Sequence, residues 1–342
     1  MRIRSFYLRG VRGLPDINLD FLDEATGQIR PRMVIAGSNG TGKTTILEAI
    51  YALLELVKGK KPAWLRPNGA QAGIVVTDLP FAPDYSSLVI EVGNPQQMVG
   101  IAYLSGRRAI SSGPEPSGPN ITYVGSPAEQ IPAKIKEAEA GKIDFPNCLY
   151  FPSEGRELQP KQVGQVIGEP KGYQWVYRFS DSREWKGSLE SFLVAMDYRD
   201  LMAQREGRTG DGEFQQFVKV INRFLQGRRV AGIDQKSFRV QVKADNGRQF
   251  SVDALSSGEK QILLMLGEIQ RRIRRGGILL IDEPEIHLHP QWQRLLVRAL
   301  TDLCAEHDAQ LIITTHSEEV ASAVYEHELV LLDAVFAWEP QP

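Results

Sequence analysis

A glycine-rich segment at residues 37–44 constrains this chain more than any other feature. It reads Gly-Ser-Asn-Gly-Thr-Gly-Lys-Thr and follows the apolar run 33–35. A strand, a glycine turn and a helix in this order hold phosphate groups, because the turn exposes backbone N–H groups and the helix N-terminus is positive. After the turn, apolar residues do recur at helical spacing: Ile46, Leu47, Ile50, Leu53, Leu54 and Val57. The segment therefore predicts a nucleotide site in an α/β fold.

Each residue type in this segment has a predicted role. The Lys43 ammonium is expected to reach the β- and γ-phosphates, and the Thr44 hydroxyl to ligate Mg²⁺. A chance glycine turn is the alternative, and the flanking strand and helix disfavour it. The predicted nucleotide-binding residues of the segment are Gly37, Ser38, Asn39, Gly40, Thr41, Gly42, Lys43, Thr44 and Thr45.

Two carboxylates follow an apolar run in the last third of the chain. Residues 278–281 read Ile-Leu-Leu-Ile, which is typical of a buried strand, and Asp282 and Glu283 come next. Ligands of α/β proteins bind at the carboxyl ends of such strands. We therefore expect Asp282 to hold Mg²⁺ through its water shell and Glu283 to orient or deprotonate the attacking water. A solvated acidic turn is the alternative for this pair.

Residues 255–261, Leu-Ser-Ser-Gly-Glu-Lys-Gln, precede a second amphipathic helix. Ser256 and Glu259 have the spacing of a capping box, which would make the segment only a helix start. Alternatively, they form an anion site together with Ser257 and Gly258 at the helix N-terminus. A second anion site in a chain with one phosphate loop implies a second nucleotide, most simply one bound by a partner subunit.

His316 follows the next apolar run, residues 311–314. An imidazole at the end of a buried strand can hydrogen-bond a γ-phosphate and sense its presence, although a lone histidine is more often structural. His287 and His289 are two residues apart on a predicted turn. They lack an obvious third ligand, which disfavours a zinc site.

Taken in order, these four segments resemble the ATP-binding-cassette (ABC) ATPases of the RecF/SMC-like branch. Residues 37–44 resemble Walker A, 255–261 the signature motif, 278–283 Walker B, and His316 the switch histidine. The resemblance implies a P-loop NTPase domain with a mixed β-sheet flanked by helices, with ATP and Mg²⁺ as ligands. It implies a homodimer that holds ATP between Walker A of one chain and the signature motif of the other. Glu283 and His316 are then the catalytic residues.

The run from Asp282 to Gln291, Asp-Glu-Pro-Glu-Ile-His-Leu-His-Pro-Gln, is similar to that of OLD-family ATPases (overcoming lysogenization defect) and of related bacterial defence systems. OLD nucleases continue into a Toprim domain with its own metal-binding acids. This chain ends at Pro342, shortly after its last predicted strand, so we expect no nuclease in it. For the family's glutamine lid loop, which senses Mg²⁺, Gln159 is the candidate residue.

The remaining patterns suggest one ABC-type ATPase domain over residues 1–342. Short β-like runs at 74–77, 88–92 and 99–104 predict an antiparallel β lobe, and an Asn246-Gly247 turn predicts a β-hairpin. Helical segments near 189–205 and 213–225 predict a helical insertion. We divide the domain into a Walker A lobe (1–57), the β lobe with linkers (58–185), the helical insertion (186–232) and a lobe with the signature, Walker B and switch histidine (233–342).

Charge and composition limit the partners. The 40 Lys and Arg residues against 42 Asp and Glu residues give a net charge of −2, so nucleic-acid binding requires a local patch or dimerisation. The candidate patches are four arginines between 271 and 275 and the pair at 228–229, although cations at a helix C-terminus also complement its dipole. No apolar run has the length of a transmembrane helix. Cys148 and Cys304 lack metal-ligand spacing, and a cytoplasmic protein is expected.

Together these features predict an ATP-driven dimeric switch. The leading hypothesis is the ATPase or sensor subunit of a two-component, nucleic-acid-directed anti-phage defence system, whose effector is a separate nuclease or toxin. Oligomers larger than a dimer are compatible with it, and no membrane partner is expected. The alternatives are a RecF-like DNA-repair clamp without a dedicated effector, the motor of a membrane transporter, and a scaffold that binds ATP with little turnover. An intact Glu283 disfavours the scaffold.

Overall fold

The protein is built on a parallel sheet whose six strands have the order β15-β3-β14-β13-β8-β9. The structure is a computed structural model that describes residues 1–58, 71–79, 87–92, 99–104, 122–124, 126–154, 172–179, 185–207, 210, 212–234 and 239–333. The strands are β3 (Arg32–Ala36), β8 (Cys148–Phe151), β9 (Val176–Arg178), β13 (Ile278–Asp282), β14 (Gln310–Thr315) and β15 (Leu329–Leu331). β13 and β14 are buried along their whole length, as their continuous apolar runs predict.

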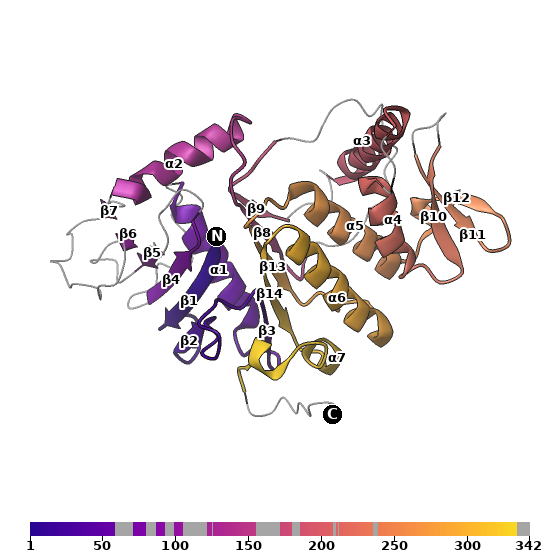
Figure 1. Ribbon diagram of the computed structural model, residues 1–342. Helices are drawn as coiled ribbons and strands as arrows, with labels where there is room; N and C mark the ends of the chain where they lie inside the picture. Colours follow the sequence, from indigo (N-terminus) through magenta and orange to yellow (C-terminus); the bar gives the residue numbers. More distant parts are fainter. Residues whose placement is uncertain are drawn as a thin grey trace.

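Helices cover both faces of this sheet (Figure 1). α1 (Lys43–Leu56) packs on one face, and α5 (Ser257–Arg272) and α6 (Pro290–Glu306) pack on the other. Alternate residues of β3 divide between the two cores, because Met33 and Ile35 pack with α1 whereas Val34 packs with α5 and α6. The predicted α/β class is confirmed. The carboxyl ends of β3, β13 and β14 meet at one edge, where ligands bind in such folds.

A second sheet packs over α1, with the strand order β2-β1-β4-β5-β6-β7. All its neighbouring strands are antiparallel except β6 and β7, which are parallel. The runs predicted at 74–77, 88–92 and 99–104 are strands of this sheet. Its elements are β1 (Arg2–Arg9), β2 (Ile17–Asp20), β4 (Gln71–Thr77), β5 (Ser87–Val92), β6 (Val99–Leu104) and β7 (Thr122–Val124), followed by α2 (Ser126–Glu139).

The two sheets divide the chain differently from the predicted lobes. β1 and β2 fall in the predicted Walker A lobe, yet β1 pairs with β4 and so both extend the second sheet. β8 and β9 fall in the predicted β lobe, yet β8 pairs with β13 in the parallel sheet and β9 pairs with β8. The reason is visible in β8, which reads Cys-Leu-Tyr-Phe and is buried at every residue. A strand without polar alternation fits the interior of a parallel sheet.

The predicted helical insertion (186–232) contains α3 (Trp185–Arg205) and α4 (Glu213–Asn222), but its last residues belong to the strand β10 (Arg228–Ile233). Asp200 of α3 is buried, and its Oδ2 accepts the first N–H groups of α4, from Phe214 (3.0 Å) and Gln215 (3.3 Å). This carboxylate at the α4 N-terminus fixes the two helices together, since it satisfies donors that a helix start leaves unpaired.

A three-stranded antiparallel sheet follows α4. It contains β10 (Arg228–Ile233), β11 (Val240–Ala244) and β12 (Gln249–Ser251). The predicted Asn246-Gly247 hairpin joins β11 to β12, whereas the sequence did not predict β10. The short helix η2 (Val252–Ala254) leads into α5, and α7 (Glu318–Ala321) and η3 (Glu326–Glu328) follow β14. Among the described residues, no helix combines the length and apolar character needed to cross a membrane.

Candidate functional site

The phosphate loop connects β3 to α1 and folds around its own lysine. Lys43 Nζ donates hydrogen bonds to the carbonyl oxygens of Gly37 (2.8 Å) and Ser38 (2.9 Å), and only 4% of its side chain is exposed. Gly42 has a φ of 95°, and a Cβ atom there would lie 2.6 Å from Leu14 Cδ1. Glycine is therefore required at residue 42, just before α1. The two hydrogen bonds of Lys43 hold its ammonium group within the loop.

The other loop residues are placed by short-range contacts. Thr41 Oγ1 donates to the Ser38 carbonyl (2.9 Å), and the Ser38 N–H donates to Asp333 Oδ2 (3.0 Å). Asn39 and Gly40 are exposed. Thr45 is buried in α1, where its hydroxyl accepts a hydrogen bond from Arg12 Nη1 (3.5 Å). The side chain of Thr45 thus contacts the loop between β1 and β2.

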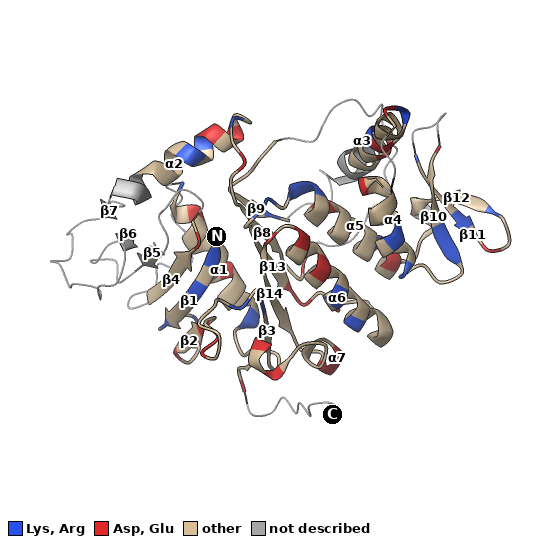
Figure 2. Cartoon of the chain, in the orientation of Figure 1, with Lys and Arg blue, Asp and Glu red and all other residues tan. Residues whose placement is uncertain are grey.

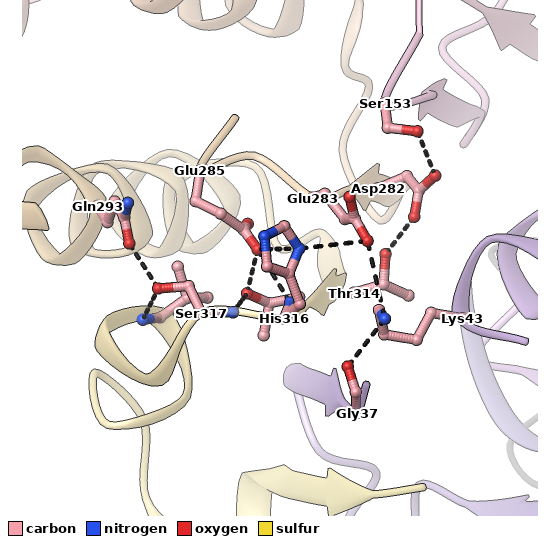
Figure 3. Close-up of polar contacts among 12 residues, drawn as sticks. Gly37, Lys43, Ser153, Asp282, Glu283, Glu285, Gln293, Thr314, His316 and Ser317 are labelled. Carbon is pink, nitrogen blue, oxygen red and sulfur yellow. Dashed lines mark hydrogen bonds and ion pairs between the residues drawn. The ribbon is translucent and has the colours of Figure 1, made fainter. Parts of the chain in front are cut away.

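The Asp282 carboxylate lies at the end of β13 and is fully buried among hydroxyl groups (Figure 3). Oδ2 accepts hydrogen bonds from Thr44 Oγ1 (2.8 Å) and Ser153 Oγ (3.0 Å), and Oδ1 accepts one from Thr314 Oγ1 (2.5 Å). The fold thus brings together Thr44 and Asp282, which are 238 positions apart. Their oxygens are the hard donors that Mg²⁺ prefers, so this donor set fits the magnesium site that the sequence predicts.

Glu283 follows Asp282 and has a left-handed backbone, with a φ of 48°. A residue with a Cβ costs about 1 kcal/mol or more in this conformation. Its N–H donates to the Thr314 carbonyl (2.9 Å), which holds the turn in place. The carboxylate Oε1 lies 3.7 Å from Lys43 Nζ and 3.4 Å from His316 Nδ1. The strained backbone therefore directs Glu283 at the phosphate loop.

His316 follows β14, and its ring nitrogen Nδ1 lies between two carboxylates (Figure 3). Glu283 Oε1 is 3.4 Å away and Glu285 Oε1 is 3.5 Å away. Glu285 Oε1 also accepts hydrogen bonds from the His316 backbone N–H (3.0 Å) and from the Thr315 hydroxyl. Because Glu285 is buried while the His316 ring is 46% exposed, Glu285 fixes the end of β14 and the ring reaches outward.

Glu285 gives a testable dependence of stability on pH. Its Oε2 has no hydrogen-bond partner among the described residues, and burial raises the pKa of the carboxyl above its usual value. The folded state then binds the proton more tightly than the unfolded state does, so ionisation of Glu285 lowers stability as pH rises through the folded-state pKa. We expect Glu285→Gln to raise Tm at about pH 8, with a gain that shrinks toward about pH 5.

Thermal melting followed by circular dichroism at both pH values measures this gain. Glu306→Gln, at the exposed end of α6, is the matched control and should leave Tm unchanged at either pH. A Glu285→Gln chain that melts lower than the unaltered chain at the higher pH contradicts the burial argument.

The signature segment forms the N-terminus of α5 and contains the predicted capping box. Ser256 Oγ accepts the Glu259 N–H (3.3 Å), and Glu259 Oε2 accepts the Ser256 N–H (2.7 Å). Glu259 Oε2 also accepts a hydrogen bond from Arg228 Nη1 (3.3 Å), which ties β10 to this segment. The helix-start interpretation is compatible with the anion site. Within the described structure the N–H groups of Ser257 and Gly258 have no acceptor, and the Ser256 hydroxyl retains its own proton to donate.

The run after Walker B connects the signature segment to the switch histidine. A Cβ atom at Gly258 would lie 3.2 Å from the His287 carbonyl, so α5 packs closely on this run. Gln293 Nε2 donates to the Leu288 carbonyl (3.0 Å), while its Oε1 accepts the Ser317 hydroxyl (2.5 Å), next to His316. A displacement of the signature segment would therefore shift the segment that contains His316, and the reverse.

Some predicted residues have other uses or other neighbours. His289 Nδ1 accepts the Gln291 N–H (3.4 Å) and caps α6, which is a structural role. Gln159 lies outside the described residues. Ser153, which lies just after β8, donates the hydrogen bond to Asp282 that is described above. Sequence reasoning missed Ser153 and Glu285; the available signals were a hydroxyl residue shortly after a buried strand and a third acid after Walker B.

The arginines at the end of α5 do not form one exposed patch. Arg271 Nη2 (2.6 Å) and Arg272 Nε (2.7 Å) both bind Glu268 Oε2, and their side chains are only 3% and 13% exposed. Arg275 is exposed. The basic residues of β10 and β11 and those at the end of α5 lie on separate elements (Figure 2). Contact between this cluster and nucleic acid stays a prediction, and the buried Arg271 would take no part in it.

Comparison with known proteins decides the family. A family model described as "AAA domain, putative AbiEii toxin, Type IV TA system" matches residues 135–322, more than half of the chain. The chain belongs to this family. The matched residues include Asp282, Glu283, His316 and the segment 255–261, whereas residues 37–44 lie outside the match.

Curated relatives agree with an ABC-type ATPase of the defence type. The chain is 26% identical over 201 residues to "Retron Vc95 probable ATPase" of Vibrio cholerae, covering 51% of this chain and 37% of that protein. It is 30% identical over 117 residues to "Septu protein PtuA" of Bacillus thuringiensis, covering 30% of this chain and 29% of that protein. The chain thus spans less than two fifths of the length of these relatives.

A transport ATPase is similar as well. "Phosphonates import ATP-binding protein PhnC 1" of Rhodopseudomonas palustris is 37% identical over 209 residues, covering 57% of this chain and 68% of that protein. This relative and the AbiEii-type family place the chain among the ABC-type ATPases, which confirms the class that the order of the four motifs predicts.

Proposed function

We propose that this chain hydrolyses ATP as a dimeric switch and serves as the ATPase subunit of an anti-phage defence system with a separate effector. One observation carries the ATPase part. Lys43 and Thr44 of the phosphate loop lie within hydrogen-bond or ion-pair distance of Asp282 and Glu283, from the opposite end of the chain. A phosphate-binding loop beside a magnesium-type carboxylate and a poised base is the equipment for phosphoryl transfer to water.

Each residue has a role in this proposal. Lys43 neutralises phosphate charge from within the loop, where the Gly37 and Ser38 carbonyls position it. Thr44 and Asp282 hold Mg²⁺, which supplies charge neutralisation at the phosphates when it is bound. Glu283 accepts the proton of the attacking water, since it is the carboxylate nearest Lys43 Nζ. A His316 that donates its Nδ1 proton to Glu283 or Glu285 presents Nε2 to the γ-phosphate.

The dimer follows from where the signature segment lies. α1, which follows the phosphate loop, and α5, which begins with the signature, pack on opposite faces of the parallel sheet. In the described part of the chain no hydrogen bond or ion pair joins residues 256–258 to residues 37–45. The exposed Ser257 and the donors beside it are therefore available to a nucleotide held by a second copy, and ATP would bridge two chains.

Blocking the signature surface should prevent this dimer. In a Glu283→Gln chain, which is expected to retain ATP, we predict an ATP-dependent dimer in light scattering coupled to gel filtration. Adding Ser257→Arg should give a monomer, because the long cation fills the space of the partner's phosphates. Ala25→Arg, the same type of change on the exposed turn between β2 and β3, should leave the dimer intact. Equal dimer formation by all three chains would contradict the signature-mediated dimer.

The defence role is supported by the retron and Septu relatives and is tested by identifying what the closed dimer holds. The Glu283→Gln chain would be expressed in its native host and purified in ATP, and the proteins and nucleic acids in the eluate identified. We expect a companion protein in stoichiometric amount, a nuclease or a toxin. Nucleic acid without a companion would favour the RecF-like repair clamp. A membrane permease as companion would favour a transport role. This is the competing hypothesis to test because the chain is similar to an import ATP-binding protein.

A further inference from the structure

A cavity of about 340 Å³ lies at the C-terminal end of α5, away from the phosphate loop. It opens between α3 and α4 of the helical insertion and the strands β8 and β9. Its lining includes Arg199 of α3, Arg272 and Arg274 at the end of α5, and the aromatic residues Tyr173, Tyr177 and Phe192. Small-ligand sites typically start at about this volume.

The arginines around the cavity are not equally paired with carboxylates. Arg199 pairs with Glu213 (3.3 Å), and Arg274 lies 4.0 Å from Asp144. Arg271 and Arg272, in contrast, share the single carboxylate of Glu268, whose side chain is only 1% exposed. Two adjacent and largely buried guanidinium groups thus share one carboxylate. A buried positive charge without its own counterion is costly, unless an anion from outside compensates it.

Donors remain unpaired at the same place. Arg271 Nε and Nη1 are buried without hydrogen-bond partners. Arg272 uses only Nε for Glu268, so within the described structure its Nη1 and Nη2 have no acceptor. Burial lowers the pKa of His307, another lining residue, below its usual value, which favours the uncharged imidazole. The unpaired donors are therefore concentrated at Arg271 and Arg272.

Aromatic surface adjoins this charge. The Arg272 guanidinium lies 4.0 Å from the centre of the Tyr177 ring, in a cation–π contact. Tyr173 is held over the cavity by a hydrogen bond from its hydroxyl to the Pro146 carbonyl (2.9 Å). Stacked arginine and tyrosine planes are the surfaces on which nucleobases pack. Charge for a phosphate and planes for a base thus lie within one small cavity.

We propose that this cavity is a second nucleotide site, which binds a mononucleotide with its phosphate at Arg272 and Arg274 and its base against the aromatic residues. The site is independent of ATP hydrolysis at the phosphate loop. It joins the end of the signature helix to β8, which pairs with the Walker B strand, and to the helical insertion. A bound mononucleotide would therefore contact all three elements. It would stabilise their relative positions when a nucleotide binds to the signature segment.

Calorimetric titration of the full-length Lys43→Ala chain tests the site, because the phosphate loop is disabled in it. The probes are AMP, adenosine, inorganic phosphate and a single-stranded oligonucleotide. We expect AMP to bind at one site per chain and to bind more tightly than each of the other probes. Arg274→Ala, which removes a partly exposed side chain, should weaken AMP about 10-fold or more. Arg275→Ala, the adjacent arginine outside the cavity, should have no effect.

Several results would overturn the proposal. Absence of AMP binding would do so, as would equal losses in the Arg274 and Arg275 variants. Tighter binding of the oligonucleotide would assign the surface to nucleic acid instead. Because Arg272 is largely buried, Arg272→Lys serves as a second variant: it keeps the charge but loses the planar fork. We expect weaker AMP binding, and thermal melting without nucleotide shows whether the chain still folds. Failure of ATP hydrolysis by the unaltered chain would leave these expectations unchanged.

Discussion

Glu283→Gln should lower the rate of ATP hydrolysis about 10²- to 10⁴-fold while ATP remains bound. The amide keeps the size of the side chain but cannot accept the proton of the attacking water. Lys43 Nζ lies 3.7 Å from Glu283 Oε1. Removal of the negative charge of Glu283 should therefore leave the binding of phosphate by Lys43 equal or stronger. Phosphate release under saturating ATP measures the rate, and filter binding of labelled ATP measures occupancy.

The matched control for this change is Glu306→Gln, which alters an exposed acid at the end of α6. It should hydrolyse ATP at the unaltered rate. Normal turnover by the Glu283→Gln chain would remove the role of base from Glu283, and the neighbouring Glu285 would then be the carboxylate to examine, because it also contacts His316 Nδ1.

Lys43→Ala should weaken ATP binding itself, by about 10- to 100-fold or more, because a charged hydrogen-bond donor to phosphate is lost. The same change removes the two contacts that hold the loop together, to the Gly37 and Ser38 carbonyls. Equilibrium titration with a fluorescent ATP analogue gives the affinity, and the Kd is the quantity compared.

Lys136→Ala, on the exposed face of α2, is the control and should bind ATP as the unaltered chain does. Thermal melting without nucleotide separates a lost contact from a lost fold. A Lys43→Ala chain with the unaltered melting temperature and unaltered ATP affinity would show that residues 37–44 do not form the nucleotide site.

Much of the candidate site could be predicted from the sequence, because its chemistry is encoded by short-range patterns. The spacing of Gly37, Gly42 and Lys43 places a lysine at a helix start, and the apolar run before Asp282 places an acid at a strand end. Both local structures are found as predicted. The capping box of Ser256 and Glu259 is likewise a property of four consecutive residues, and both of its hydrogen bonds are present.

Long-range placement could not be predicted in the same way. Ser153 and Thr314 come to Asp282 only because β8 and β14 both pair with β13. The membership of β1 and β2 in the second sheet depends on pairing across the chain. Their burial alternates, as in a strand with one face buried, but this alternation does not say which strands they pair with. The predicted lobe boundaries therefore differ from the boundaries of the sheets, and the division into lobes stays a prediction.

The sequence by itself determined the phosphate loop, the Walker B acids, the capping box and the class of fold, since each depends on backbone conformation and burial within a few residues. Only the tertiary structure decided that Glu285 supports His316, that Arg271 is buried while Arg275 is exposed, and that charge and aromatic surface meet at the end of α5. The physical reason is that these properties depend on which distant elements exclude water from a side chain. Local periodicity shows which face of an element is apolar, but it does not show which distant element buries it.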